Sequence, residues 1–178
     1  MKQLLLCLTL SALAFGQDAS WDNSPPARQL ADQASRLKPL LNQLTPEAWV
    51  AKGAPDTYVK QWRSAQQELD DLTNTALHLD QQPQRLTIAL DTYFRLQSLE
   101  WRMESLIEAA RRYQGPAAGD QMLSVLRANA THRDTLRQYI SELAARKEQE
   151  FTIVNRDAQL CRQQLTEIPT AIRRTQKR

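Results

Sequence analysis

The sequence has few of the residues that recurring catalytic and nucleotide-binding motifs require. Its 178 residues include only four glycines and two histidines. No Gly-rich phosphate loop and no dinucleotide fingerprint is present, because both need closely spaced glycines. Neither His78 nor His132 has the Glu-x-x-His spacing of di-iron bundles, and the internal serines fall within expected helices instead of on the strained turn of a serine nucleophile. We therefore expect no catalysis, no metal and no cofactor.

Long apolar runs are also absent, except at the start of the chain. Residues 1–16 combine a basic start at Lys2, an apolar run, and small side chains at Ala14 and Gly16. This is the layout of a cleavable signal peptide. A membrane anchor would need about 20 apolar residues, and this run ends sooner. We expect export to the periplasm or the extracellular space, and no transmembrane segment after cleavage.

Cysteine is nearly absent, and Cys7 would leave with the signal peptide. Cys161 would then be the only cysteine and could not form an internal disulfide. An unpaired cysteine in an oxidising compartment indicates either an intermolecular bridge or a buried thiol. We favour the buried thiol, because a free cysteine packs like a small hydrophobic side chain.

An excess of charge of one sign is missing as well. The chain has 23 basic and 20 acidic residues, a net charge of +3, and its basic excess lies in a tail, residues 170–178. A nucleic-acid binder usually presents a basic face that neutralises several phosphates, and no internal segment has one. We expect no nucleic-acid partner, and we interpret the tail as a solvated end.

Apolar side chains recurring every three or four residues dominate the rest of the chain. Between a polar leader, residues 17–26, and the tail, residues 27–169 show this spacing repeatedly, and no segment alternates every second residue. The clearest series lies between Pro55 and Asp80 and comprises Tyr58, Trp62, Ala65, Leu69, Leu72, Ala76 and Leu79. The pattern predicts an all-α fold, an antiparallel bundle of about four helices with a long C-terminal helix.

Proline and glycine mark the expected breaks between helices. Pro39 lies inside the first apolar series and predicts a kink or restart near Lys38. Gly53 should end a short helix, and Pro83 should be the first residue of the third long helix.

The last helix is expected to be longer than the others, because no strong breaker precedes Pro169. Its C-terminal half carries an apolar stripe, which we predict to be an interaction surface, formed by Phe151, Val154, Cys161 and Leu165. This half either bends back onto the N-terminal helix or leader of its own chain, or it projects and meets a partner or a second copy.

Aromatic residues make up only 6% of the chain, but three of them surround one break between helices. Trp49, Tyr58 and Trp62 lie there, and we expect Tyr93 or Trp101 to face them across the bundle. Such rings either line a pocket for a small apolar ligand or plug the end of a bundle, and we favour the plug.

The function that these features favour is protein–protein interaction by an exported, non-catalytic helical bundle. A periplasmic holdase-type chaperone, which would grip unfolded chains with an exposed apolar surface, is one alternative. A carrier of a small apolar ligand, built on the aromatic residues, is another. No run of residues in the sequence separates the three.

Overall fold

Every regular element in the part of the chain that the structure describes is a helix. The computed structural model describes the backbone of residues 26–175 and the side chains of residues 27–128 and 130–165. The expected signal peptide, the leader before Pro26 and residues 176–178 of the tail lie outside the described residues. The helices are α1 (Pro26–Ser35), α2 (Leu37–Asn42), α3 (Pro46–Ala51), α4 (Thr57–Gln81), α5 (Leu86–Tyr113) and α6 (Pro116–Thr175). The predicted all-α fold is confirmed.

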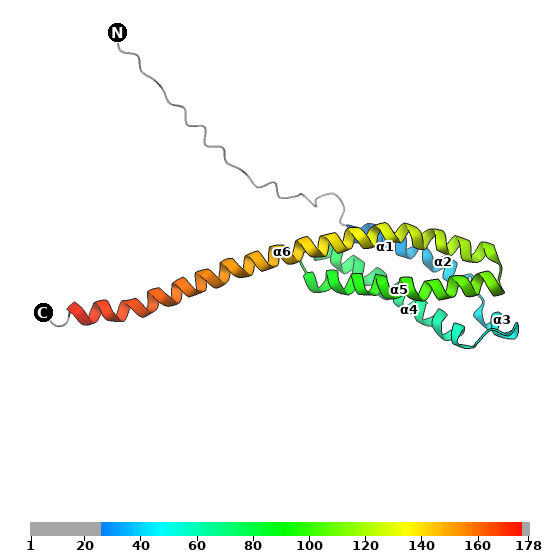
Figure 1. Ribbon diagram of the computed structural model, residues 1–178, viewed down its shortest axis with the longest axis horizontal. Helices are drawn as coiled ribbons and strands as arrows, with labels where there is room; N and C mark the ends of the chain where they lie inside the picture. Colours follow the sequence, from blue (N-terminus) through cyan, green and yellow to red (C-terminus); the bar gives the residue numbers. More distant parts are fainter. Residues whose placement is uncertain (1–25, 176–178) are drawn as a thin grey trace, which may run out of the picture.

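Four helical rods form the bundle. The first rod is α1 followed by α2, and the others are α4, α5 and α6 (Figure 1). The first rod packs on α4, α4 on α5, α5 on α6, and α6 on the first rod again, so the rods close a ring around one core. The short helix α3 lies at one end of the bundle, near the connection from α5 to α6 (Figure 1). The predicted antiparallel bundle with a long last helix is confirmed.

The inward positions of α4 show why the sequence spacing works. Ala65, Leu69, Leu72, Ala76 and Leu79 are all nearly inaccessible to solvent. Steps of three and four residues keep them on one side of the helix, so the whole series meets the neighbouring rods. Each buried leucine contributes about 2 kcal/mol relative to an exposed one. The alanines between them let the neighbouring rods approach closely.

The first rod breaks where proline predicts it. Arg36 lies in a turn between α1 and α2, and its N–H donates to the carbonyl of Gln33 at 3.2 Å. Pro39 has no N–H to donate to Ser35, so one helical hydrogen bond is missing at this point. The restart at Leu37 confirms the predicted break near Lys38.

The start of α5 differs from the prediction. The helix begins at Leu86 instead of Pro83, and Arg85 precedes it with φ −91° and ψ 94°, an extended conformation. Pro83 lies in the connection from α4 to α5, where its carbonyl accepts a hydrogen bond from the hydroxyl of Tyr139 on α6. Pro83 therefore lies in a turn that a hydrogen bond from α6 holds in place, and it is not the first residue of α5.

Helix α6 is much longer than the bundle that it helps to form. It has 60 residues and is about 90 Å long, whereas α4 and α5 have 25 and 28 residues. Leu143 is the last buried residue recorded on α6, and residues 148–165 are all exposed. The C-terminal part leaves the bundle as a single rod (Figure 1). Of the two predicted alternatives, packing back onto the N-terminal helix is wrong for residues 148–165, which project from the bundle. The leader, the other surface that this alternative named, lies outside the described residues.

Candidate functional site

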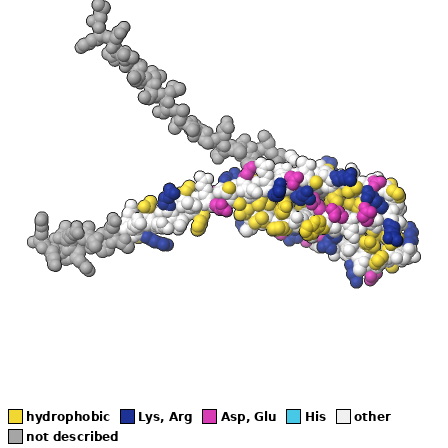
Figure 2. All heavy atoms as spheres, viewed as in Figure 1, with side chains coloured by type: hydrophobic (Ala, Val, Ile, Leu, Met, Phe, Trp, Pro, Cys, Tyr) yellow, Lys and Arg dark blue, Asp and Glu magenta, His cyan; other side chains and the backbone are white. Residues whose placement is uncertain are grey.

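The projecting segment, residues 151–165 of α6, carries the largest group of exposed apolar side chains. Phe151 is 71% exposed, Val154 65% and Leu165 67%. Hydrophobic side chains are visible on the rod after it leaves the bundle (Figure 2). Scattered apolar residues are ordinary on a protein surface, whereas a continuous series along one helix marks an interaction site. This segment contains all four residues that the sequence analysis assigned to an interaction surface.

The exposed apolar residues of the projecting segment fall on two faces. The first face, called the seam below, consists of Phe151, Val154, Ala158, Cys161 and Leu165, at successive steps of three and four residues. Ile153 and Leu160 lie seven residues apart on another face and are 50% and 51% exposed. Because an α-helix has 3.6 residues per turn, this pair is turned well over 90° from the middle of the seam. The seam is the longer and more exposed of the two faces.

Cys161 is exposed, so the prediction of a buried thiol is wrong. The physical reason is its place on α6. No second helix accompanies α6 beyond the bundle in the described chain, so the cysteine has nothing to pack against. Its spacing from the apolar residues matches that of a core position, and sequence spacing alone cannot show whether a partner helix is present.

The bundle holds α6 firmly at the point where the helix leaves it. The hydroxyl of Tyr139 donates to the carbonyl of Pro83, and Leu143 is completely buried one turn later. Arg133, further back on α6, forms an ion pair with Glu100 of α5 at 2.9 Å. The projecting segment therefore starts from a fixed base, which sets its direction.

Glu100 is a buried carboxyl that the sequence analysis missed. It is 6% exposed, and burial raises the pKa of its carboxyl above the usual range, against the opposing effect of the nearby Arg133 guanidinium. Its position gave a signal: Glu100 lies four residues after Leu96 and three before Met103, both completely buried. A carboxylate on the inward face needs a cation, and α6 supplies it. The pair connects two rods and is distant from the seam in sequence.

The aromatic residues close one end of the bundle. The Trp49 ring is completely buried, lies 6.2 Å from the Tyr58 ring at an interplanar angle of 76°, and lies 6.4 Å from the Tyr113 ring at 23°. We call Trp49, Tyr58 and Tyr113 the aromatic cluster. Trp62, on the next turn of α4, donates from Nε1 to the carbonyl of Leu41 at 2.7 Å. Centroid distances of this size are those of rings in direct contact.

Trp101 and Tyr93 do not take the place that the sequence analysis gave them. Trp101 is 67% exposed, because it follows the buried Leu99 by two residues and therefore points to the opposite side of α5. Tyr93 contacts Phe94 instead, with ring centroids 5.7 Å apart. The residue that faces Trp49 is Tyr113, at the C-terminal end of α5.

Gln114, just after α5, connects the aromatic cluster to the segment after the first rod through hydrogen bonds. Its Oε1 accepts hydrogen bonds from the Nε1 of Trp49 at 3.2 Å and from the backbone N–H of Thr45 at 3.2 Å. Its Nε2 donates to the carbonyl of Gln43 at 2.9 Å. One amide thus satisfies the buried indole and the backbone around the start of α3. Rings in contact, with the indole N–H groups of Trp49 and Trp62 already paired, are the arrangement of a plug.

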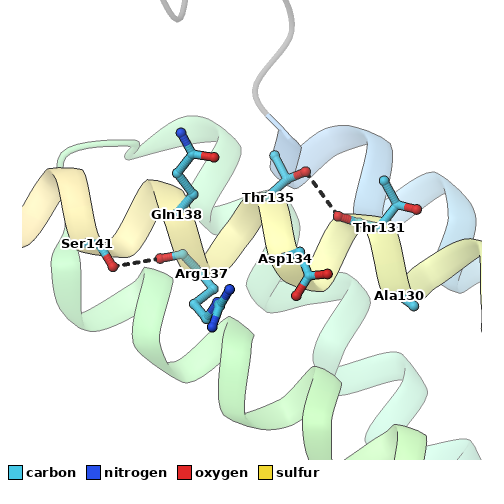
Figure 3. Close-up of a pocket in the computed structure, with 7 residues that line it drawn as sticks. All are labelled: Ala130, Thr131, Asp134, Thr135, Arg137, Gln138 and Ser141. Atoms are coloured by element: carbon cyan, nitrogen blue, oxygen red, sulfur yellow. Dashed lines mark hydrogen bonds between the residues drawn. The ribbon is translucent and has the colours of Figure 1, made fainter.

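A shallow depression of about 730 Å³ lies on the outer side of α6 within the bundle region. Every described residue that lines it comes from α6: Ala130, Thr131, Asp134, Thr135, Arg137, Gln138 and Ser141. Their side chains spread to both sides of the helix and do not converge on a common point (Figure 3). A binding pocket surrounds its ligand, so a surface made by one helix is a weak candidate.

The described residues offer neither a metal site nor a membrane-spanning helix. No group of three or more histidine, cysteine, aspartate or glutamate side chains there is placed to hold a metal ion. His132 stands alone on α6, and burial lowers its pKa. Within the same part of the chain, no helix is both long enough and apolar enough to cross a bilayer.

Comparison with known proteins adds no assignment. No protein-family model, curated protein or solved structure matches the chain. The candidate site is therefore defined by the chain's own geometry, and the seam is its best-supported location.

Proposed function

We propose that the protein is an exported, non-catalytic interaction protein that binds a protein partner through the seam of its projecting segment. One observation carries the proposal: α6 continues far beyond its bundle as a rod whose seam is apolar and exposed. Each square ångström of apolar surface removed from water contributes about 25 cal/mol, so Phe151, Val154 and Leu165 gain free energy when a partner covers them.

The completeness of the bundle supports an external partner. The four rods already close a ring, and Leu143 is buried before the helix leaves it. Residues 151–165 add nothing to this core, because all of them are exposed. A segment that does not stabilise its own fold and still displays large apolar side chains is best explained by binding.

Export is supported by the sequence. The basic start, apolar run and small residues of segment 1–16 form the pattern that a signal peptidase recognises. The test is the N-terminus of the purified protein. Cleavage near Gly16 supports export, and an intact Met1 in protein from the cells that naturally make it contradicts it.

The first test of the interaction role is a chain that ends at Glu150. We expect its thermal unfolding midpoint to stay within about 2 °C of the full chain, because the removed residues whose side chains are described, 151–165, are all exposed. The measurement is the melting curve followed by circular dichroism. A large drop in the midpoint, or loss of a cooperative transition, would show that residues after 150 belong to the core and would contradict the proposal.

The second test compares neighbouring positions on the two faces. A photoreactive amino acid at position 154 should give protein adducts in the cells that make the chain, and the same group at position 153 should give few. Positions 165 and 160 form a second such pair, since both are leucines in the natural chain. Equal adducts from both faces would contradict a role specific to the seam.

A holdase-type chaperone remains the second candidate, because Ile153 and Leu160 place apolar side chains on a second face of the rod. Unfolded clients have no fixed shape and would use both faces. The test is light scattering from an aggregating client protein. Equal loss of protection in Leu160→Asp and Leu165→Asp would favour the holdase, and no protection by the natural chain would exclude it.

A further inference from the structure

We propose that the partner of the seam is a second copy of this chain, bound as an antiparallel pair of α6 helices. This inference rests on the proposed function in one respect, namely that the seam is an interaction surface. It adds the identity of the partner, the direction of its helix and the residues that face one another.

The spacing of the seam fits a single facing helix. Its five residues alternate steps of three and four, an average of 3.5, which is the repeat of a two-helix coiled coil. In heptad positions a to g, Phe151, Ala158 and Leu165 occupy a, while Val154 and Cys161 occupy d. A strict a and d stripe is narrow, so one helix covers it. A second copy supplies a stripe with the same period.

The position of the bundle decides the direction of the second helix. Cys161 follows Leu143 by eighteen residues, or five turns of 3.6, and Val154 follows it by eleven, or about three turns. The seam therefore lies on the same side of α6 as Leu143, which is buried against the other rods. A parallel partner helix on the seam would run, toward its N-terminus, into the space that the other three rods occupy (Figure 1). The C-terminal end of an antiparallel helix stops before it reaches those rods. The bundle of the second copy then lies beyond the C-terminal end of the first copy's α6.

The seam also selects one antiparallel register. When position 154 faces position 165 of the second copy, position 158 faces 161. Val154 then meets Leu165, and Ala158 meets the Cys161 thiol. Large residues lie toward both ends of the contact, and the small pair Ala158 and Cys161 lies at its centre. Shifting the helices by one heptad toward the bundles would place Leu165 opposite Lys147 of the second copy and leave it without an apolar partner.

Charges beside the seam agree with this register. Asp157 and Gln164 flank one edge, and Asn155 and Arg162 flank the other. In the proposed register Asp157 lies near Gln164 of the second copy, and Asn155 lies near Arg162, so each charge meets a neutral amide. A shift of one heptad in one direction brings the two Asp157 carboxylates together, and a shift in the other direction brings the two Arg162 side chains together. Like charges at these positions are destabilising.

The first experiment measures the mass of the processed chain, which lacks residues 1–16 and therefore Cys7, by sedimentation over a wide concentration range. We expect a reversible rise from one chain to two, because a contact of this length makes a weak dimer. Val154→Asp and Leu165→Asp should abolish the rise. Ile153→Asp and Leu160→Asp are matched controls, with the same substitutions on the other face, and should preserve it.

The second experiment tests direction and register with disulfides. In the processed chain with Cys161→Ser, we mix a Val154→Cys chain with a Leu165→Cys chain and add oxidised glutathione. The two thiols form one disulfide and transfer two electrons and two protons to the glutathione, which becomes two reduced molecules. We expect covalent heterodimers from the mixture and little product from either chain alone. A homodimer disulfide from the Val154→Cys chain alone would instead indicate parallel helices and overturn the inference.

A third experiment adds charge across the contact. Gln164→Arg should face Asp157 of the second copy at two symmetric places and lower the dissociation constant by about fivefold. Gln159→Arg adds the same charge away from the seam and should change it little. Equal effects of the two substitutions would contradict the register.

Failure of this inference can be distinguished from failure of the proposed function. A chain that stays monomeric at all concentrations, or that forms trimers, overturns the antiparallel pair. If its position 154 still forms photoadducts with a different protein, the interaction role stands and only the partner is wrong. If truncation after Glu150 unfolds the bundle, the interaction role itself fails.

Discussion

At the scale of single residues, the Glu100–Arg133 pair is the most consequential polar contact between α5 and α6. Glu100 lies on the inward face of α5, and its carboxylate depends on the guanidinium 2.9 Å away. Arg133→Met leaves that carboxylate buried and unpaired, so we expect a loss of ~2 kcal/mol in the free energy of unfolding at neutral pH. Urea unfolding of the natural protein and of the Arg133→Met variant measures this loss.

The loss of stability caused by Arg133→Met should depend on pH in a defined direction. Burial raises the pKa of Glu100 in the folded chain above its usual value of 4.5. Between pH 4.5 and this raised pKa, the folded chain therefore holds more protons than the unfolded chain. Stability from this group is therefore lost as the pH rises through the raised pKa. The cost of Arg133→Met should be smallest in acid and largest at neutral pH. The double variant with Glu100→Gln is the control, and an identical pH dependence in both variants would contradict this account.

Gln114 provides a second prediction at this scale. Gln114→Ala removes the acceptor of the buried Trp49 indole and of the Thr45 N–H, so we expect a loss of about 1–2 kcal/mol. Gln121→Ala, at an exposed position on α6, should change stability by less than about 0.5 kcal/mol. Thermal unfolding by circular dichroism compares the two. Equal stabilities would show that water replaces the amide without cost.

Individual side chains were the least predictable feature of this chain. Apolar spacing identified Leu69 and Leu72 as buried because one helix face decides their environment. It missed Glu100 and Gln114, since their roles depend on Arg133 and Trp49, which lie far away in the sequence. It misplaced Cys161 because a core-like spacing indicates a face that can be covered, and the described chain supplies no cover.

At the scale of helices, the prediction from sequence succeeded where a local rule decides the outcome. The restart after Ser35 follows from the missing N–H of Pro39, and α3 ends before Gly53, whose φ of +91° suits glycine. Pro83 failed as a helix start, because a contact with α6 holds the turn around it. Local chemistry thus fixes most boundaries, and tertiary contacts adjust the rest.

The first turn of α6 gives a prediction about how closely α5 and α6 pack. A Cβ on Gly119 would lie 2.9 Å from the carbonyl oxygen of Ile107 and closer still to the Arg111 side chain. Alanine normally favours a helix over glycine by about 1 kcal/mol. Here we expect Gly119→Ala to lower stability by about 1–2 kcal/mol, because backbone must shift to admit the methyl group.

Thermal unfolding of the natural protein and of the Gly119→Ala variant measures this loss of stability. Ala117→Gly, at an exposed position two residues earlier, should show only the ordinary helix penalty and serves as the control. A gain in stability from Gly119→Ala would mean that α5 and α6 lie farther apart at this end than the structure places them.

At the scale of the whole molecule, the protein consists of a closed bundle and a long rod that leaves it. The sequence predicted the rod's excess length, because no strong breaker precedes Pro169, but left its direction open. The helix continues through Pro169 and ends at Thr175. Two outcomes were compatible with the same apolar stripe: folding back onto the chain, or projection toward another protein. The described residues favour projection, since the four rods close a ring and residues 151–165 are all exposed.

This division predicts two levels of stability within one helix. A single helix of about 15 residues is marginal in water, whereas residues 136–143 share the stability of the bundle. In dilute protein, we expect backbone amides of residues 151–165 to exchange with deuterium much faster than those of residues 136–143. Hydrogen-exchange mass spectrometry measures both sets on the same molecules.

Hydrogen exchange measured at several protein concentrations also tests the pairing of two α6 helices. Pairing of two α6 helices should slow exchange in residues 151–165 as the concentration rises, while the bundle amides stay unchanged, since only the rods are in contact along the seam. Leu165→Asp should remove the concentration dependence, and Leu160→Asp should keep it. Strong protection of residues 151–165 in dilute protein would mean that the rod packs on its own chain, which would contradict both the proposed function and the antiparallel pair.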